Sequence, residues 1–156
     1  MDVRLREVQD TDLPTFWEQV TDPQVRRMAA VTRNYHYDRG EFDRFWAVVR
    51  ADPGVIVRTV LADGAVAGNA AIFGPPSERE VTYVVARRFW GRGVATAALA
   101  LLIELDDARP LHADAAADNA GSIRVLEKCG FAITGRSRGF ARARGEDIEM
   151  VHLTLS

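Results

Sequence analysis

Two glycines flanked by arginines stand where a strand-like run gives way to a helix-like run. The segment RFWGRGVAT extends from Arg88 to Thr96 and follows the apolar run Glu80–Val85. The first N–H groups of a helix have no partner inside the helix, and the helix dipole adds partial positive charge there. Glycine lets an anion approach these groups, and the guanidinium groups of Arg88 and Arg92 suit phosphate oxygens. The spacing therefore predicts a cradle for a pyrophosphate.

Two common phosphate-binding loops do not match this segment. The P-loop pattern G-x-x-x-x-G-K-[ST] is absent from the sequence. The dinucleotide pattern G-x-G-x-x-G fails because Thr96 occupies the third glycine position, although Asp114 stands where the ribose-binding acid would be expected. Only one clear strand–helix–strand unit is present, whereas that fold repeats the unit. A nucleotide-binding α/β domain is therefore disfavoured.

Two motifs together resemble one enzyme superfamily. Arg88-x-x-Gly91-x-Gly93 resembles R/Q-x-x-G-x-G/A, the acyl-CoA pyrophosphate loop of the GNAT superfamily of N-acyltransferases. The stretch from Asn119 to Phe131 resembles the second signature of that superfamily, N-x-x-S-x-x-x-x-x-K-x-G-F. The strand before the loop is similar to that of the branch containing ribosomal-protein N-terminal acetyltransferases. The resemblance covers residues 79–131, and the order and spacing of two separate signatures make it specific.

The resemblance implies that acetyl-CoA is the co-substrate and that two strands diverge around its pantetheine arm. Glu80–Val85 and Leu111–Ala116 would be these strands, and a backbone N–H near Val84 or Val85 would polarise the thioester carbonyl. The residues assigned to acyl-CoA in this way are Val84, Val85, Arg88, Gly91, Arg92, Gly93, Val94, Ala95, Thr96, Asn119, Ser122 and Lys128.

Each of these assignments has a structural alternative. The side chains of Val84 and Val85 suit a strand core. Asn119 or Ser122 would also serve as an ordinary helix N-cap. Lys128, like Arg124, would also suit a solvated helix surface.

Acyl transfer to an amine needs a base for the amine and a proton for the departing thiolate. Many members of the superfamily supply that proton from a tyrosine past the Gly-Phe pair, but this chain has Phe140 in that region and no tyrosine after Tyr83. Ser122, Cys129, Tyr83 or water are the remaining candidates. Glu80 is the candidate base, and strand periodicity places it on the face of Thr82 and Val84. A surface carboxylate at a strand edge is the alternative for Glu80.

Two further segments are candidates for contact with the acceptor. His36 lies in the aromatic run Tyr35-His36-Tyr37, which the resemblance places near the acceptor pocket, while packing of an exposed loop is the alternative. Arg136, Arg138, Arg142 and Arg144 form a basic run in the last hairpin connection, where a solvated loop is the default and an acidic acceptor the sharper hypothesis. The histidines lack metal-ligand spacing, so no metal site is predicted.

Composition narrows the class of protein. The chain has 156 residues, which suits one domain over 1–156, and a net charge of −2, which argues against non-specific binding of nucleic acid. No apolar run is long enough for a membrane span. Cys129 is the only cysteine, so an internal disulfide is impossible and a cytoplasmic location is expected. A homodimer is left open.

The apolar patterning predicts an α/β fold in the order β-α-α-α-β-β-β-α-β-α-β-β. This order is that of the GNAT fold, which implies a mixed, mostly antiparallel sheet, a central parallel pair splayed around the acyl-CoA arm, and helices on both faces. The predicted elements are strands 3–8, 55–61, 65–73, 80–85 and 111–116, helices 12–20, 22 onward, 38–51, 94–107 and 121–129, and a final hairpin from 131 and 148–155.

Three functions can be weighed against these features. The first is transfer of an acetyl group from acetyl-CoA to a primary amine, either a protein N-terminal α-amine or a small-molecule amine. The second is a non-catalytic acyl-CoA-binding module, which the missing tyrosine favours. The third, a nucleotide-binding domain, fails at Thr96.

Overall fold

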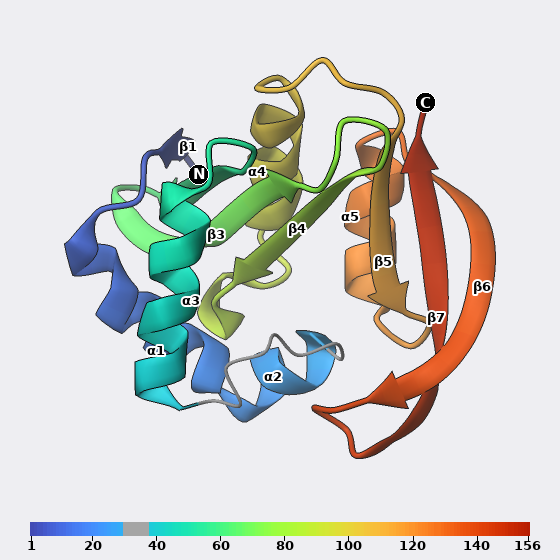
Figure 1. The fold of residues 1–156 in the computed structure, drawn as a ribbon, viewed down its shortest axis with the longest axis horizontal. Coiled ribbons are helices and arrows are strands. Elements are labelled where there is room, and N and C mark those ends of the chain that lie inside the picture. Colours follow the sequence, from blue (N-terminus) through green and yellow to red (C-terminus); the bar gives the residue numbers. More distant parts are fainter. Residues whose placement is uncertain (30–37) are drawn as a thin grey trace.

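A seven-stranded sheet with helices on both faces forms the framework of the computed structural model, which describes residues 1–29 and 38–156 (Figure 1). The strand order is β1-β2-β3-β4-β5-β7-β6. The elements are β1 Val3–Arg6, η1 Asp10–Asp12, α1 Leu13–Thr21, α2 Pro23–Ala29, α3 Arg39–Ala51, β2 Ile56–Ala62, β3 Ala65–Phe73, β4 Arg79–Val85, η2 Arg87–Phe89, α4 Val94–Ile103, β5 Leu111–Ala116, α5 Ala120–Lys128, β6 Ala132–Ala141 and β7 Glu146–Leu155. The predicted order and fold class are confirmed, with short 3-10 turns η1 and η2 added.

The predicted boundaries were wrong at two places. The helix expected to reach residue 107 ends at Ile103, because Asp106 beyond it accepts hydrogen bonds from the Arg79 guanidinium and from the N–H of Ala108. These bonds turn the chain toward β5. The basic run expected in the last connection is also displaced, since Arg136 and Arg138 lie within β6 and pair with β7.

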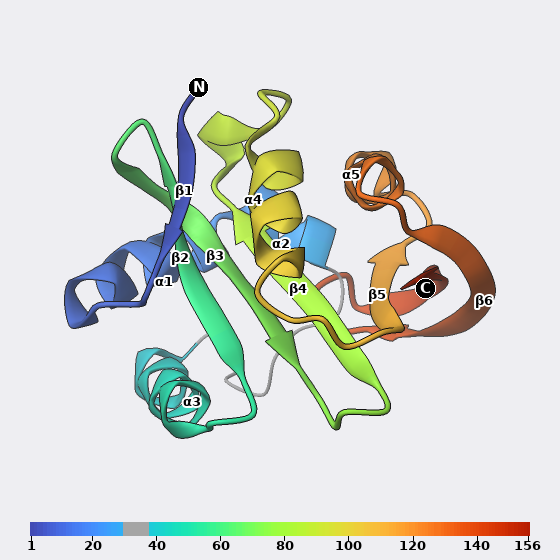
Figure 2. The same cartoon turned by 90° about the horizontal axis from the view of Figure 1, so that it is seen from above.

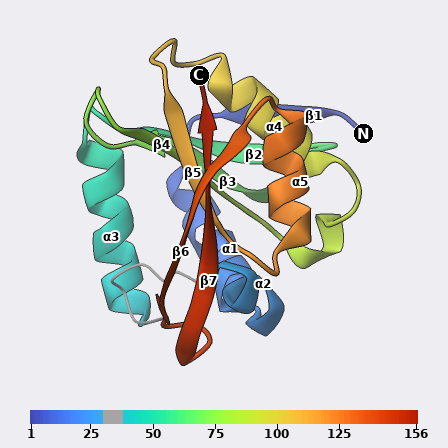
Figure 3. The ribbon, with the colours of Figure 1, turned by 90° about the vertical axis from the view of Figure 1, so that its right-hand side faces the viewer.

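The sheet is antiparallel except between its two central strands. β4 and β5 pair in parallel only at Arg79–Leu111 and Glu80–His112. On its other edge β4 pairs with β3 from Glu80 to Val85, and β5 pairs with β7 along its whole length. The two strands therefore separate toward their C-terminal ends while their outer edges stay fixed. Figure 2 shows β5, β7 and β6 set apart from the first four strands, and Figure 3 views the molecule from the side of β6 and β7, with the first four strands behind them.

Each face of the sheet has its own apolar core. α4 and α5 cover one face, and α1 and α3 cover the other over β2 and β3 (Figure 2). Leu99 and Leu102 of α4 are fully buried in the first core, and burial of each such side chain stabilises the folded state by about 1.5–3 kcal/mol. Phe16 of α1 and Trp46 of α3 stack in the second, with ring centroids 5.0 Å apart. The predicted apolar face of α3 is confirmed.

Asp12 joins the first strand to the rest of the sheet. Its buried carboxylate accepts two hydrogen bonds from the Arg6 guanidinium, at 2.7 and 2.9 Å, and one from the Thr59 hydroxyl at 2.6 Å. The hydrogen bonds from Arg6 are the main cause that lowers the pKa of Asp12 from 3.8 to about 2. The carboxylate form is therefore the one that stabilises the fold.

We predict that Asp12→Asn lowers the free energy of unfolding by about 2 kcal/mol at neutral pH, since each unit of pKa shift corresponds to about 1.4 kcal/mol. Because the pKa of Asp12 is lower in the folded state, its carboxylate stabilises the fold at pH values above the unfolded pKa of 3.8. This stabilisation is lost as the pH falls toward 2. The stability gap between wild type and variant, measured by urea unfolding, should therefore close across that window. Asp10→Asn, in the same turn but with an exposed carboxylate, is the control and should change little. A gap that does not depend on pH would contradict this account.

Candidate functional site

The glycine turn after β4 adopts the backbone that an anion cradle requires. Gly91 and Gly93 have φ angles of 71° and 79°, in the left-handed region, and Gly93 is the N-cap of α4. A Cβ added at either position would meet no atom within 4 Å, so glycine is needed for its backbone conformation and not for lack of room in the protein. Gly93 has no side chain to cap the helix, so no N-cap side chain occupies the N–H groups at the start of α4.

Two arginines are held beside this turn by one buried ring. The guanidinium carbon of Arg88 lies 4.5 Å from the centroid of Phe89, and that of Arg92 lies 5.8 Å from it. Phe89 is buried, whereas both arginines are exposed. Among the residues that the structure describes, neither arginine has a carboxylate partner, in contrast to Arg87, which pairs with Asp22. Two cations are thus available next to the helix start.

The turn is fastened to β4 by a tryptophan. The indole N–H of Trp90 donates a 2.8 Å hydrogen bond to the carbonyl of Val85, the last residue of the strand. No pattern in the sequence predicts this contact, since a tryptophan beside two glycines would equally suit an exposed loop. The bond fixes where β4 ends relative to the cradle.

The gap between β4 and β5 leads to the cradle. Beyond Glu80 and His112, the pairings in the described part of the chain give neither strand a partner on its inner edge. Val84 and Val85 lie on this stretch of β4. On the outer edge β3 approaches closely at Gly68, where an added Cβ would lie 1.9 Å from the carbonyl oxygen of Val84. The backbone of β4 is thus held firmly on one side and open on the other.

A hydrogen bond spans the gap on the side of α5. The hydroxyl of Tyr83 lies 2.8 Å from the hydroxyl of Ser122 and 3.3 Å from its carbonyl oxygen. Burial raises the pKa of Tyr83 to about 12. Thiols titrate near 8.5, so transfer of a proton from Tyr83 to a thiolate would be uphill by several pKa units. Tyr83 can therefore donate a hydrogen bond there but is a poor source of a proton.

Asn119 is the N-cap of α5, as its structural alternative predicted. Its side-chain oxygen accepts from the N–H of Ser122 at 3.1 Å, and its NH₂ group donates to the carbonyl of Met28 at 3.2 Å. Asn119 therefore joins α5 to α2, which contacts both β4 and β5. One of the two N–H donors of the amide is sufficient for Met28.

The far end of α5 lies beside the start of α4. The Cys129 thiol is 3.6 Å from the carbonyl of Thr96, and burial raises the pKa of this thiol. Cys129 and Ser122 are seven residues apart, or about 10 Å along a helix. Lys128 is exposed next to Cys129, which puts the base of its side chain at the cradle end of α5.

Comparison with known proteins identifies the family. The model of the acetyltransferase (GNAT) domain matches residues 2–132. The chain belongs to the GNAT acetyltransferases. The predicted superfamily is thereby confirmed, and acetyl-CoA is the co-substrate of these enzymes. A search of the curated proteins gave no match.

Solved structures support the GNAT fold over nearly the whole chain. A ribosomal-protein-alanine N-acetyltransferase from Brucella melitensis is 24% identical, with a TM-score of 0.81 over 97% of this chain and 98% of that one. A spermidine N-acetyltransferase from Vibrio cholerae, with CoA and spermine, is 15% identical, with a TM-score of 0.81 over 97% and 95%. A third, AAC(6')-Ib in complex with ribostamycin and coenzyme A, is 19% identical, with a TM-score of 0.78 over 100% and 94%.

The remaining residues singled out in the sequence do not gather at one place in the described part of the chain. Glu80 lies on the face of β4 opposite Tyr83, as predicted, and pairs in register with His112. Phe140 is exposed on β6. His36 and its aromatic neighbours lie outside the described residues. The described residues hold no cluster that could bind a metal and no helix long and apolar enough to cross a membrane.

The basic run is not the solvated loop that we expected. The Arg144 side chain is only 2% exposed, forms a bidentate pair with Asp118 and donates to the carbonyl of Arg27. Arg136 pairs with Glu149 across β6 and β7. Arg144 thus helps Asn119 to hold α2, and tertiary contacts that sequence spacing cannot reveal decide its role.

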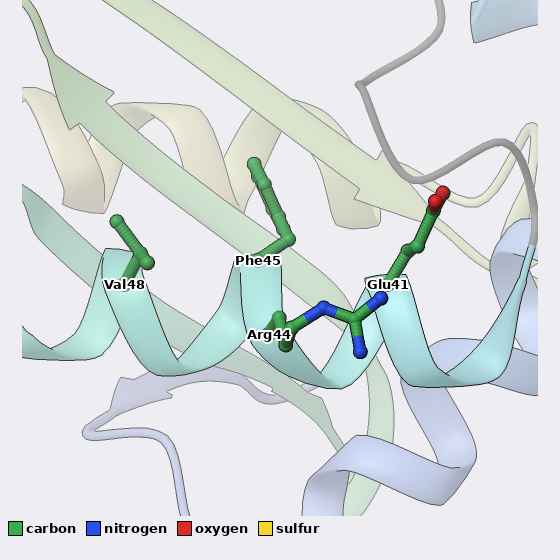
Figure 4. Close-up of a pocket in the computed structure, with 4 residues that line it drawn as sticks. All are labelled: Glu41, Arg44, Phe45 and Val48. Atoms are coloured by element: carbon green, nitrogen blue, oxygen red, sulfur yellow. The ribbon is translucent and has the colours of Figure 1, made fainter.

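Two surface hollows lie away from the gap. One, of about 350 Å³, follows α3 and is lined by Glu41, Arg44, Phe45 and Val48, all from that helix (Figure 4). The other lies around Arg79, at the end of β4 remote from the glycine turn. Neither shares a residue with the cradle.

We predict that Gly93→Asn removes the thermal stabilisation by acetyl-CoA. Asparagine tolerates the left-handed backbone, so the fold should survive, but its side chain would occupy the anion's approach. Saturating acetyl-CoA should raise the melting temperature of wild type, since a ligand that binds only the folded state stabilises it. Gly64→Asn is the matched control, because Gly64 has a φ of 83° and open surroundings in the β2–β3 turn. An equal rise in both variants would contradict the assignment.

Proposed function

We propose that this GNAT chain acts as one domain over residues 1–156 and transfers the acetyl group of acetyl-CoA to a primary amine. The observation that carries the proposal is the gap between β4 and β5 that opens onto the glycine turn. In a sheet that served stability alone, the two central strands would be expected to pair beyond Glu80 and His112. The acceptor would be either a protein N-terminal α-amine or a small-molecule amine.

The proposed position of acetyl-CoA uses both ends of the gap. The pyrophosphate would accept from the N–H groups of Gly91 to Thr96, with Arg88 and Arg92 on its flanks. The pantetheine arm would pair with the inner edge of β4 near Val84 and Val85, chiefly at the N–H of Val85, since the Val84 carbonyl faces β3 and the Val85 carbonyl accepts from Trp90. The second N–H of Asn119 would donate to the same arm. Lys128 would approach the nucleotide from the end of α5. The exposure of Arg88, Gly91, Arg92, Gly93 and Lys128 is consistent with these contacts, whereas the side chains of Val85 and Val94 are buried and only their backbone would take part.

Glu80 is the proposed base. The amine must be neutral to attack the thioester. A carboxylate at the last residue pair before β4 and β5 separate could accept the proton of the amine. Glu80 lies on the face opposite α4 and α5, so the acceptor would enter from that side while the thioester comes from the other. Such separation would keep the two substrates from competing for one entrance.

Ser122 is proposed to pass a proton to the departing thiolate and not to be its source. The attacking nitrogen becomes acidic once it bonds to the carbonyl carbon, so it can supply that proton. A hydroxyl both donates and accepts hydrogen bonds, which suits Ser122 for the transfer. Tyr83 would hold Ser122 in place through the 2.8 Å contact. On this account a late tyrosine is not required.

The acceptor can be tested with a panel of amines of the kinds named for the similar solved structures. The panel would contain a peptide beginning with alanine, spermidine and an aminoglycoside, and CoA release would be measured. Turnover of any member supports the proposal. Binding of acetyl-CoA without turnover of any amine would favour the alternative, a non-catalytic acyl-CoA-binding module. The cytoplasm remains the proposed compartment because a lone cysteine suits a reducing interior.

We predict that Glu80→Gln lowers kcat by about 10²–10⁴, the usual range for a lost general base. The affinity for acetyl-CoA should stay the same, because Glu80 lies at the opposite end of β4 from the cradle. Initial rates against pH would show a loss of the acidic limb. Glu78→Gln, an exposed carboxylate just before β4, is the control. Normal turnover by Glu80→Gln would mean that water or another group takes the proton.

A further inference from the structure

Three side chains on neighbouring strands form a hydrogen-bonded chain that the functions proposed so far do not use. Nδ1 of His152, on β7, lies 2.5 Å from Oδ1 of Asp114, on β5. Nε2 of the same ring lies 2.7 Å from Oγ of Ser137, on β6. A carboxylate oxygen accepts the proton of Nδ1, and the Ser137 hydroxyl, which can both donate and accept, bonds to Nε2. Both ring nitrogens are then occupied.

The chain ends at an oriented carboxylate. The Asp114 side chain is 46% exposed, and its one partner among the described residues is His152. Oδ2 is thus left to bind something outside the protein. His152 fixes the direction of the carboxylate, and Ser137 holds the other side of the His152 ring. An exposed aspartate on a strand would otherwise sample several rotamers.

The register of β4 and β5 places this carboxylate beside the gap. Glu80 and His112 form the last pair, and Asp114 follows His112 by two residues, on the same face. Leu111 and Ala113 point into the core under α4 and α5, so His112 and Asp114 face the other side. Glu80 and Asp114 therefore stand on the two sides of the gap and share the face proposed for acceptor entry.

We propose that Asp114 binds a positively charged group of the acceptor, with His152 and Ser137 as positioning residues. This proposal rests on the proposed function. Since Glu80 takes the proton of the reacting amine, the charge at Asp114 belongs to a second group. The Cα atoms of Glu80 and Asp114 are at least about 8 Å apart, from a strand spacing of about 4.8 Å and a rise of about 3.3 Å per residue. The substrate class is therefore an amine that carries a second positive charge on the order of 8 Å away.

The test compares acceptors that differ only in this charge. The probes are 1,5-diaminopentane against pentylamine, and a peptide with lysine against one with alanine at its second position. Wild type should have a kcat/KM at least tenfold higher for the charged member of each pair. Asp114→Asn should remove most of that preference, about 10–100-fold, because a charge-assisted contact is lost. The rate with pentylamine and the KM for acetyl-CoA should not change.

The positioning role has its own signature. His152→Gln should partly lower the preference for the acceptor with the second charge, and Ser137→Ala should lower it by a smaller factor. Neither should have any further effect in the Asp114→Asn background, because both act through that carboxylate. Asp147→Asn, which removes one exposed negative charge from β7, is the control for long-range attraction and should behave as wild type. Equal effects of Asp147→Asn and Asp114→Asn would overturn the proposal.

A binding measurement separates this proposal from the proposed function. Calorimetry of CoA-loaded protein with 1,5-diaminopentane should give a heat of binding that Asp114→Asn abolishes. If that holds but no amine is acetylated, the carboxylate site stands and the transfer reaction fails. If Asp114→Asn slows pentylamine as much as the diamine, Asp114 acts on the reacting nitrogen and the second-charge proposal is wrong. The same conclusion follows if wild type does not distinguish the paired acceptors.

Discussion

The parallel pairing of β4 and β5 stops after two residue pairs, and the architecture of the candidate site follows from that interruption. Strand backbones carry N–H and C=O groups that need partners when they are buried. Here β3 and β7 satisfy the outer edges, while the inner edges separate and remain accessible. An extended ligand arm with its own amide groups would satisfy them as an added strand does. The gap is thus a binding site because the sheet is incomplete at its centre.

The contacts around the gap keep it open at a defined width. Gly68 lets β3 approach β4, and the Trp90 indole fixes the end of β4 relative to the glycine turn. On the other side, Arg144 and Asn119 tie α2 to the loop that follows β5. These contacts come from distant parts of the sequence. They explain how β4 and β5 can separate while the two parts of the sheet stay connected.

The sequence predicted what is local and missed what is tertiary. The glycine turn, the order of elements and the N-cap at Asn119 follow from spacing and propensity within a few residues, and the structure confirms them. The early end of α4, the burial of Arg144 and the Tyr83–Ser122 bond depend on residues from tens of positions away. The chain from Asp114 through His152 to Ser137 joins three strands whose pairing order no single segment encodes. The roles of Glu80 and Ser122 stay predictions.

Backbone amide hydrogen exchange with and without CoA tests the central claim most directly, because it reports on the N–H groups that the gap leaves open. The account predicts that CoA slows exchange at the inner edge of β4, around Val84 and Val85, and at the start of α4, from Gly93 to Thr96. β2 and α3 should exchange at unchanged rates. Saturating CoA that protects another surface, or leaves β4 and the start of α4 unaffected, would contradict the account.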